Sequence, residues 1–138
     1  MISFAAFEGV WQIDRAIADA LSGTGQFIGR AQLSVAGPGA LLYAEEGVLT
    51  LADGSSFAAA RQYHWTEVPE EGGVAVHFTD GRFFHRFSLG VQAEAAHFCD
   101  PDQYDVTYDF ANWPRWQARW RVTGPRKDYV MTSRYARA

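Results

Sequence analysis

Cysteine is almost absent from this sequence, and long apolar runs are absent altogether. Cys99 is the single cysteine among 138 residues, which excludes an internal disulfide and zinc sites built from several thiolates. A single free thiol fits a reducing compartment. No apolar run reaches the roughly 20 residues of a membrane-spanning helix, and the short apolar stretch before Glu8 lacks the basic start of a secretory signal. We therefore expect a cytoplasmic protein with no membrane partner.

Basic residues are also few. The chain has 12 basic and 16 acidic residues and a net charge of −4, and Lys127 is its only lysine. Nucleic-acid-binding chains carry a basic patch, so we expect no nucleic-acid partner. Arginine, which makes up the rest of the basic set, suits buried ion pairs and planar contacts with anions. With 48% hydrophobic and 20% charged residues, the composition is that of one globular domain over residues 1–138.

Short runs of alternating apolar and polar residues lie between closely spaced turn signals such as Asp53-Gly54 and Asp80-Gly81. The clearest runs are residues 103–110 and 115–122, which have the two-residue period of half-buried strands. We predict an all-β fold with a single antiparallel up-and-down barrel of about eight to ten strands, because closure into a barrel removes exposed edges. An open sandwich is the alternative.

Residues 14–21 near the start fit a helix as well as a strand. Ile13, Ile17 and Leu21 lie four residues apart, and the alanines between them favour a helix. The same residues also alternate, so that Trp11 and Arg15 join Ile13 and Ile17 on one strand face. We predict a strand.

Two sets of residues carry a resemblance to known families. Gly9-Val10-Trp11 on the first strand, with Arg134 or Arg137 on the last, resembles the calycin superfamily of lipocalins, fatty-acid-binding proteins and nitrobindin-like proteins. In that superfamily a Gly-x-Trp packs under an arginine of the closing strand. The longer pattern looks like a bacterial family known only as a domain of unknown function, and it includes Arg61-x-Tyr63-x-Trp65, Asp80-Gly81-Arg82-Phe83-Phe84-His85 and His97-x-Cys99-x-x-Asp102-x-Tyr104. The resemblance implies a calycin-like barrel and brings no established activity.

Several polar side chains share the apolar faces of the predicted strands. They are Arg15, Tyr43, Glu45, Arg61, Tyr63, His85, Tyr104 and Tyr108. A buried guanidinium without a partner costs several kcal/mol, so Arg61 needs an anion beside it. One interpretation is a structural ion pair between Arg61 and Glu45 on the neighbouring strand. The other is that Arg61, with Tyr63 and Tyr104, holds the anionic end of a small apolar or aromatic ligand.

For the ligand hypothesis we predict a binding site inside the barrel. Its residues are Arg61, Tyr63, His85, Tyr104, Tyr108 and Glu45. A second hypothesis is a small barrel enzyme of the isomerase, decarboxylase or hydratase type. His85 or His97 with Asp102 would then exchange protons, and Tyr104 would donate to a developing oxyanion. A third is a ligand-free barrel that acts through a protein interface, for example as a homodimer.

Metal and cofactor signals are weak. The chain has no His-x-His or His-Glu-x-x-His spacing, so we predict no metal site, although His85, His97 and Cys99 offer a remote zinc alternative. The lack of Cys-x-x-Cys-His excludes covalent haem, and non-covalent haem on one histidine stays a remote analogy with nitrobindin-like proteins. The ordinary roles are a core histidine bonded to a tyrosine or aspartate for His85, a turn for Asp100-Pro101-Asp102, and a buried thiol for Cys99.

Overall fold

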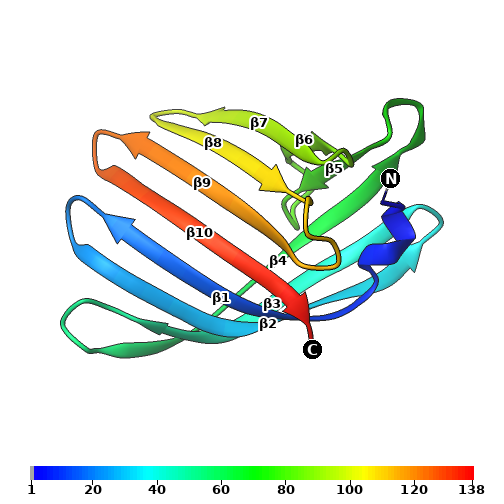
Figure 1. The fold of residues 1–138 in the computed structure, drawn as a ribbon. Helices are drawn as coiled ribbons and strands as arrows, with labels where there is room; N and C mark the ends of the chain where they lie inside the picture. The colour runs from blue at the N-terminus through cyan, green and yellow to red at the C-terminus, as the bar shows by residue number, and fades with distance from the viewer. Residues whose placement is uncertain (1) are drawn as a thin grey trace.

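The computed structural model describes residues 2–138 and contains ten antiparallel strands that follow one another around a barrel (Figure 1). The strands are β1 (Gly9–Asp19), β2 (Gly23–Gly37), β3 (Ala40–Thr50), β4 (Ser56–Val68), β5 (Gly73–His77), β6 (Phe83–Ser88), β7 (Gln92–Cys99), β8 (Asp102–Asp109), β9 (Trp116–Gly124) and β10 (Lys127–Arg137). Two 3₁₀ turns, η1 (Phe4–Phe7) and η2 (Pro69–Glu71), are the only helical elements between residues 2 and 138. None of the helices in this part of the chain is long and apolar enough to cross a membrane.

The sheet has the order β6-β5-β4-β3-β2-β1-β10-β9-β8-β7, so every neighbour in the chain is also a neighbour in space. The first and last strands pair with each other, with Trp11 opposite Arg137 and Asp19 opposite Tyr129. This confirms the predicted antiparallel up-and-down barrel. It also confirms the strand over residues 9–19, in which Ile13 is buried while its neighbours Gln12 and Asp14 are exposed.

The barrel is nearly closed, because β6 and β7 lie side by side without a hydrogen-bonded ladder between residues of the two strands. Side chains hold this seam together. The rings of Phe84 on β6 and His97 on β7 have centroids 5.3 Å apart. His85 on β6 reaches past β7 to Tyr108 on β8, with 2.8 Å between its Nε2 and the phenol oxygen.

A β-bulge decides which side chains of β6 enter the barrel. His85 pairs with Val76 and Phe83 pairs with His77, which leaves Phe84 as the extra residue. Strict alternation predicts that Phe83 shares the inner face with His85, and this prediction is wrong. Phe83 is 47% exposed, whereas Phe84 is 7% exposed and packs inside the barrel.

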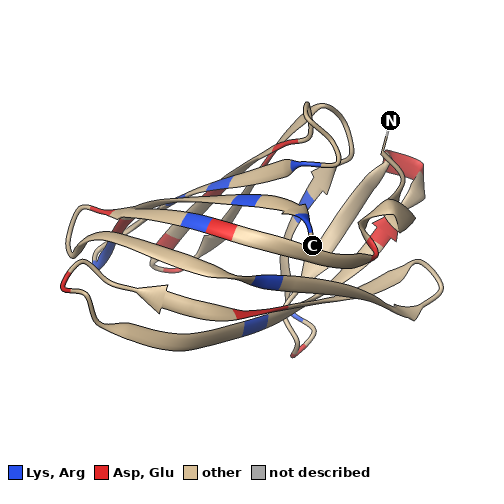
Figure 2. Ribbon diagram, turned by 60° about the horizontal axis from the view of Figure 1, so that its bottom comes forward, with Lys and Arg blue, Asp and Glu red and all other residues tan. Residues whose placement is uncertain are grey.

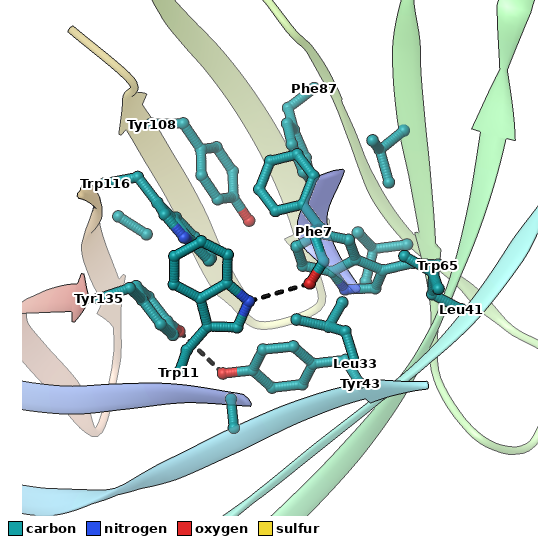
Figure 3. Close-up of a cluster of buried hydrophobic side chains, with 14 of the residues drawn as sticks. Phe7, Trp11, Leu33, Leu41, Tyr43, Trp65, Phe87, Tyr108, Trp116 and Tyr135 are labelled. Carbon is teal, nitrogen blue, oxygen red and sulfur yellow. Dashed lines mark hydrogen bonds between the residues drawn. The ribbon is translucent and has the colours of Figure 1, made fainter. Parts of the chain in front are cut away.

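Aromatic side chains fill the end of the barrel next to η1, which we call the closed end (Figure 3). Phe7 of η1 contacts Trp65 and Trp116, with ring centroids 5.4 and 5.5 Å away, and its carbonyl accepts a 2.9 Å hydrogen bond from the Trp11 indole. The ring centroids of Trp113 and Phe7 are 4.8 Å apart, so Trp113 belongs to the same aromatic cluster. The closed end therefore has no room for a ligand among these rings.

Inward-facing side chains become more exposed toward the opposite end, which we call the open end. Along β10, Tyr135 and Ser133 are buried, whereas Met131 is partly exposed. Along β4, Trp65 is buried and the Arg61 side chain is 53% exposed. Solvent thus reaches the inner wall in this half, which we call the cup. The partly or fully exposed residues of its wall are Arg61, Tyr63, His97, Tyr104, Trp120, Tyr129 and Met131. The buried ring of Phe84 packs against Tyr63 and Tyr104.

Candidate ligand-binding site

A buried ion pair lies below the cup. Arg15 on β1 and Glu45 on β3 face each other across β2, and both are almost fully buried. The guanidinium donates to both carboxylate oxygens, with Nη1 to Oε2 at 2.8 Å and Nη2 to Oε1 at 3.0 Å. Two parallel bonds of this kind are the strongest arrangement of an arginine with a carboxylate. Glu45 therefore has its full counter-charge in Arg15.

Hydroxyl groups complete the bonding of this pair, and together these five residues form what we call the polar belt. Arg15 Nε donates to Ser133 at 2.6 Å, and the Tyr43 hydroxyl donates to Glu45 at 2.6 Å. Because Tyr43 has one hydrogen to give, the Tyr135 hydroxyl donates to it across 2.8 Å (Figure 3). Burial raises the pKa of Tyr43 well above its ordinary value, so the phenol stays protonated. The belt is thus a satisfied network with no net charge.

Arg61 is left as a surplus positive charge at the edge of the belt. Its Nε lies 4.0 Å from Glu45 Oε2, a distance too long for a hydrogen bond. Its Nη1 donates a long 3.4 Å bond to the Tyr63 hydroxyl. The ion pair between Arg61 and Glu45, one of the two interpretations of the sequence, is thus present as a 4.0 Å contact, while Glu45 receives its short bonds from Arg15. The three charged groups therefore sum to one positive charge on the cup wall.

Lys127 forms a second polar group at the rim of the cup. Its ammonium donates to the Tyr104 hydroxyl at 2.8 Å and lies 3.0 Å from Asp102 Oδ2. These hydrogen bonds, first to Tyr104 and then to Asp102, raise the pKa of Lys127 above its ordinary value. The charge of Lys127 is balanced by Asp102, so this group adds no net charge to the cup.

Stacked rings form one wall of the cup. The Phe84 ring lies between Phe78, at 4.7 Å, and Trp120, at 5.2 Å, with an interplanar angle of 18° in both pairs. Tyr63 and Tyr104 approach the same Phe84 ring at 5.7 and 6.0 Å. The bulge on β6 is what brings Phe84 to this central position. A flat apolar group entering the cup would meet aromatic faces and edges here.

His85 lies deeper, between these rings and the closed end. Its ring contacts Phe84 at 4.5 Å and Trp120 at 5.0 Å, in both cases edge to face. Burial lowers the pKa of His85 to about 3, with a further contribution from His97, so the imidazole is neutral near pH 7. Its Nδ1 has no hydrogen-bond partner within residues 2–138. The expected core histidine bonded to a tyrosine is therefore found, with Tyr108 as the tyrosine.

The candidate catalytic residues are not joined into one unit. Asp102 pairs with Lys127, and His85 bonds to Tyr108. His97 packs against Phe84 and Tyr104 through ring contacts. Cys99 is exposed, which corrects the expectation of a buried thiol, because β7 ends at this residue. No group of three potential metal ligands occurs within residues 2–138.

The expected binding residues are largely brought together. Glu45, His85 and Tyr108 are buried, and Arg61, Tyr63 and Tyr104 line the cup above them. Sequence reasoning missed Ser133, Tyr135, Trp120 and Phe84 as members of the site. Alternation along residues 127–137 places Ser133 and Tyr135 on one face, and alternation along residues 115–122 places Trp120 on the apolar face. No sequence signal marks the bulge that turns Phe84 inward.

Two hollows of the surface lie elsewhere. The larger, of about 1030 Å³, follows the outer wall over β1, β2, β9 and β10, and the smaller, of about 570 Å³, lies beside Asp19 and Asp128. Arg61, Tyr63, Trp120 and Tyr104 line neither of them. The cup is therefore defined by the solvent exposure of its inward-facing residues, and neither hollow includes them.

Comparison with protein families gives one match. Residues 7–137 match the family described as "Family of unknown function (DUF6314)". The chain belongs to this family. The match covers every strand of the barrel, as the longer sequence pattern led us to expect. No curated protein matches the chain.

Solved structures share the architecture of this DUF6314 member. The S-type phycobiliprotein lyase CPES from Guillardia theta superposes with a TM-score of 0.71 at 9% identity, over 99% of this chain and 93% of the lyase. A de novo designed fluorescence-activating β-barrel superposes with a TM-score of 0.49 at 14% identity, over the whole of both chains. At 9% identity the likeness to the lyase concerns the fold alone, and it supports the up-and-down antiparallel barrel.

Proposed function

We propose that this DUF6314 protein binds a small apolar or aromatic molecule that carries an anionic group, and that the cup holds it. The observation that carries this proposal is the surplus charge of Arg61. Glu45, the nearest carboxylate, already receives two short bonds from Arg15, whereas Arg61 stands 4.0 Å away with one long bond to a phenol. A carboxylate or sulfonate entering the cup would gain the planar donor pattern that Arg61 leaves unused.

The remaining walls of the cup suit the apolar part of such a ligand. Phe84, Trp120 and Tyr63 offer ring surfaces beside Arg61's strand, and Tyr104 adds a hydroxyl at the rim. Aromatic faces with a few polar groups are the usual lining of small-molecule sites. Because rings fill the closed end, the ligand would occupy the open half only. The lyase comparison supplies the barrel alone, so the ligand class rests on these side chains.

A pair of matched fluorescent probes tests the proposal. 1-Anilinonaphthalene-8-sulfonate and N-phenyl-1-naphthylamine share one aromatic framework, and only the first carries a sulfonate. We expect saturable binding of both, with the sulfonate about tenfold tighter, since a charge-assisted hydrogen bond contributes about 1.5 kcal/mol. Failure of both probes to bind would overturn the cup as a ligand site. Equal affinities would overturn the role of the anionic group.

Two substitutions locate the probe. Arg61→Gln should weaken the sulfonate probe about tenfold and leave the neutral probe unchanged, because only the charge contact is lost. Arg119→Gln is the matched control, since Arg119 is an exposed arginine on the outer face of β9. It should change neither affinity. An equal loss in both variants would mean that the sulfonate senses the general charge of the protein and not the cup.

Binding has more support than catalysis in this arrangement. Proton transfer at neutral pH needs a group that can gain and lose a proton there, and the low pKa of His85 removes it from that range. Asp102, the proposed partner, is engaged by Lys127 at the rim. A carboxylate hydrogen-bonded to an inward-facing histidine would favour an enzyme. The hydrogen-bond partner of His85 is the Tyr108 hydroxyl instead.

We also propose that the protein is located in the cytoplasm. Cys99 is exposed and free at the end of β7, and an exposed thiol persists most readily in a reducing compartment. Thiol labelling of the protein taken directly from its own cells should find Cys99 reduced. A Cys99 found as a mixed disulfide would contradict this location.

A further inference from the structure

The hollow of about 1030 Å³ on the outer wall is lined by charged and amide side chains as well as by apolar groups, and the cup does not explain them. It lies on the outward faces of β1, β2, β9 and β10, and the loop before β9 contributes Asn112 and Arg115. Gln12 and Asp14 point outward while Ile13 and Arg15 point inward, so the groove and Arg15 of the polar belt lie on opposite faces of β1. Tyr135 of the belt also borders the groove, whereas none of the residues of the cup does. Any ligand of this groove would therefore be independent of the cup.

Three of the residues that line this groove are arginines without an ion-pair partner in the described part of the chain. Arg30, Arg115 and Arg134 all line it, and none makes a salt bridge or a side-chain hydrogen bond within residues 2–138. Elsewhere on the surface, some arginines pair with carboxylates. Arg86 reaches Glu71 at 2.8 Å and Arg121 reaches Asp128 at 2.6 Å. Figure 2 shows basic and acidic segments interspersed over the strands, so the arginines of the groove are not part of a generally basic surface.

The groove also holds groups that accept hydrogen bonds. Asp14 accepts one long 3.3 Å bond from Gln26, and Asp109 accepts one bond from the Ala111 amide through Oδ1, so both keep free lone pairs. Three amide side chains stand beside them, from Gln12, Asn112 and Gln117. The lining thus carries three positive and two negative charges together with amides. A simple anion would contact the guanidinium groups only. A ligand with hydroxyl groups could also form hydrogen bonds with the carboxylates and the amides.

We propose that this groove binds a small phosphorylated molecule that also carries hydroxyl groups, such as a sugar phosphate. The guanidinium groups of Arg30, Arg115 and Arg134 match a phosphate through paired N–H donors. Asp14 and Asp109 accept hydrogen bonds from hydroxyls, and the amides both donate and accept. An acidic peptide would bring several carboxylates beside Asp14 and Asp109. A sugar phosphate can instead turn its one anionic group toward the arginines and its hydroxyl groups toward these carboxylates, so the small ligand is the occupant that the lining favours.

Ribose 5-phosphate is the probe, with inorganic phosphate, ribose and a hexaglutamate peptide as comparison ligands. Calorimetric titration of the full chain should give saturable binding of ribose 5-phosphate, at least about tenfold weaker binding of phosphate, and none of ribose. Phosphate binding as tightly as the sugar phosphate would overturn the role of the hydroxyl groups. Tighter binding of hexaglutamate would overturn the small ligand in favour of an acidic protein, and no binding of any ligand would overturn the site.

Substitutions assign the binding to the groove. Arg30→Gln and Arg134→Gln should each weaken ribose 5-phosphate about tenfold, the effect of losing one charge-assisted bond. Arg119→Gln, outside the groove, should leave it unchanged. A similar loss in Arg119→Gln would overturn a local site.

The two sites can be told apart with the naphthalene probe of the cup. Ribose 5-phosphate should not displace 1-anilinonaphthalene-8-sulfonate, because the wall of β1 and β10 lies between them. Arg61→Gln should not change the affinity for ribose 5-phosphate. Displacement of the naphthalene probe would overturn the separation of the groove from the cup, whether or not the cup proposal itself holds.

Discussion

The guanidinium of Arg137 lies over the indole of Trp11, with 3.8 Å between its central carbon and the ring centroid. Arg137 also donates to the carbonyls of Ala6 and Glu8, and so ties the last strand to the segment that plugs the barrel. Of the two arginines that the sequence offered for this contact, Arg134 faces outward instead. The Gly-x-Trp resemblance thus corresponds to a real contact between the first and last strands.

Loss of Arg137 should weaken this closure. Arg137→Ala removes a cation–π contact and two hydrogen bonds to carbonyls, and we expect it to lower the free energy of unfolding by about 1 to 3 kcal/mol. Urea denaturation followed by tryptophan fluorescence measures the change. Arg134→Ala is the control and should stay within about 0.5 kcal/mol, as exposed sites do. Equal losses at the two positions would contradict the special role of Arg137.

Gly9 adds a second test of the same contact. Its φ of +127° disfavours any side chain, and a Cβ would come 2.7 Å from Arg137 Nη1. Gly9→Ala should cost at least about 1 kcal/mol from backbone strain, and more while Arg137 is present. The substitution should therefore cost less in the Arg137→Ala background. Strict additivity in a double-mutant cycle would show that Gly9 and Arg137 do not interact.

The polar belt predicts an asymmetric response to substitution. Arg15→Met leaves Glu45 charged and buried, so we expect a loss of about 3 to 5 kcal/mol of unfolding free energy. The double variant Arg15→Met with Glu45→Leu removes both charges and should recover most of it, since apolar replacements of a buried pair are often neutral. Chemical denaturation of the three proteins measures this. A double variant as unstable as the single one would mean that the pair itself, and not an uncompensated charge, determines stability.

Acid should weaken the same pair. Burial alone would raise the pKa of Glu45, but the hydrogen bonds and charge of Arg15 outweigh it and lower the pKa below the ordinary value. The stability that this carboxylate contributes is therefore present above the ordinary glutamate pKa and lost as the pH falls through the lowered one. In Glu45→Gln this loss should disappear, so its stability should depend less on pH in that acidic range. An unchanged pH dependence would contradict the lowered pKa.

The sequence was sufficient for the architecture because strand alternation depends on local order. Runs such as residues 103–110 alternate between a polar and an apolar face, and turn residues mark their ends. The choice of strand over helix for residues 9–19 was also correct, since burial follows a period of two there.

Side-chain partners were harder to predict, because they depend on register and tilt across several strands. Arg61 stands directly opposite Glu45 in the ladder, yet Arg15, from two strands away, takes the carboxylate. The bulge between Val76 and His77 is likewise invisible in the residue pattern, and it exchanges Phe83 for Phe84 on the inner face. The members of the site that depend on these two features therefore needed the structure.

Phe84 and Phe83 form a natural pair for testing the bulge. Phe84→Ala empties the centre of the ring cluster, and we expect a loss of about 3 to 5 kcal/mol of unfolding free energy. Phe83→Ala changes a half-exposed ring on the outer face and should cost less than about 1 kcal/mol. Urea denaturation compares the two. A larger loss for Phe83→Ala would mean that Phe83, and not Phe84, packs inside the barrel, which would contradict the bulge.

His85 predicts how stability changes in mild acid. Its folded pKa of about 3 lies below the ordinary value of 6.5, so only the unfolded chain takes up this proton between those values. Stability should therefore fall as the pH drops below about 6.5, by about 1 kcal/mol between pH 7 and pH 5.5. His85→Phe should flatten the curve in this window, which lies above the ordinary range of carboxylates. His64→Gln, at an exposed position of β4, should keep the wild-type slope. A wild-type slope retained in His85→Phe would show that another group takes up the proton.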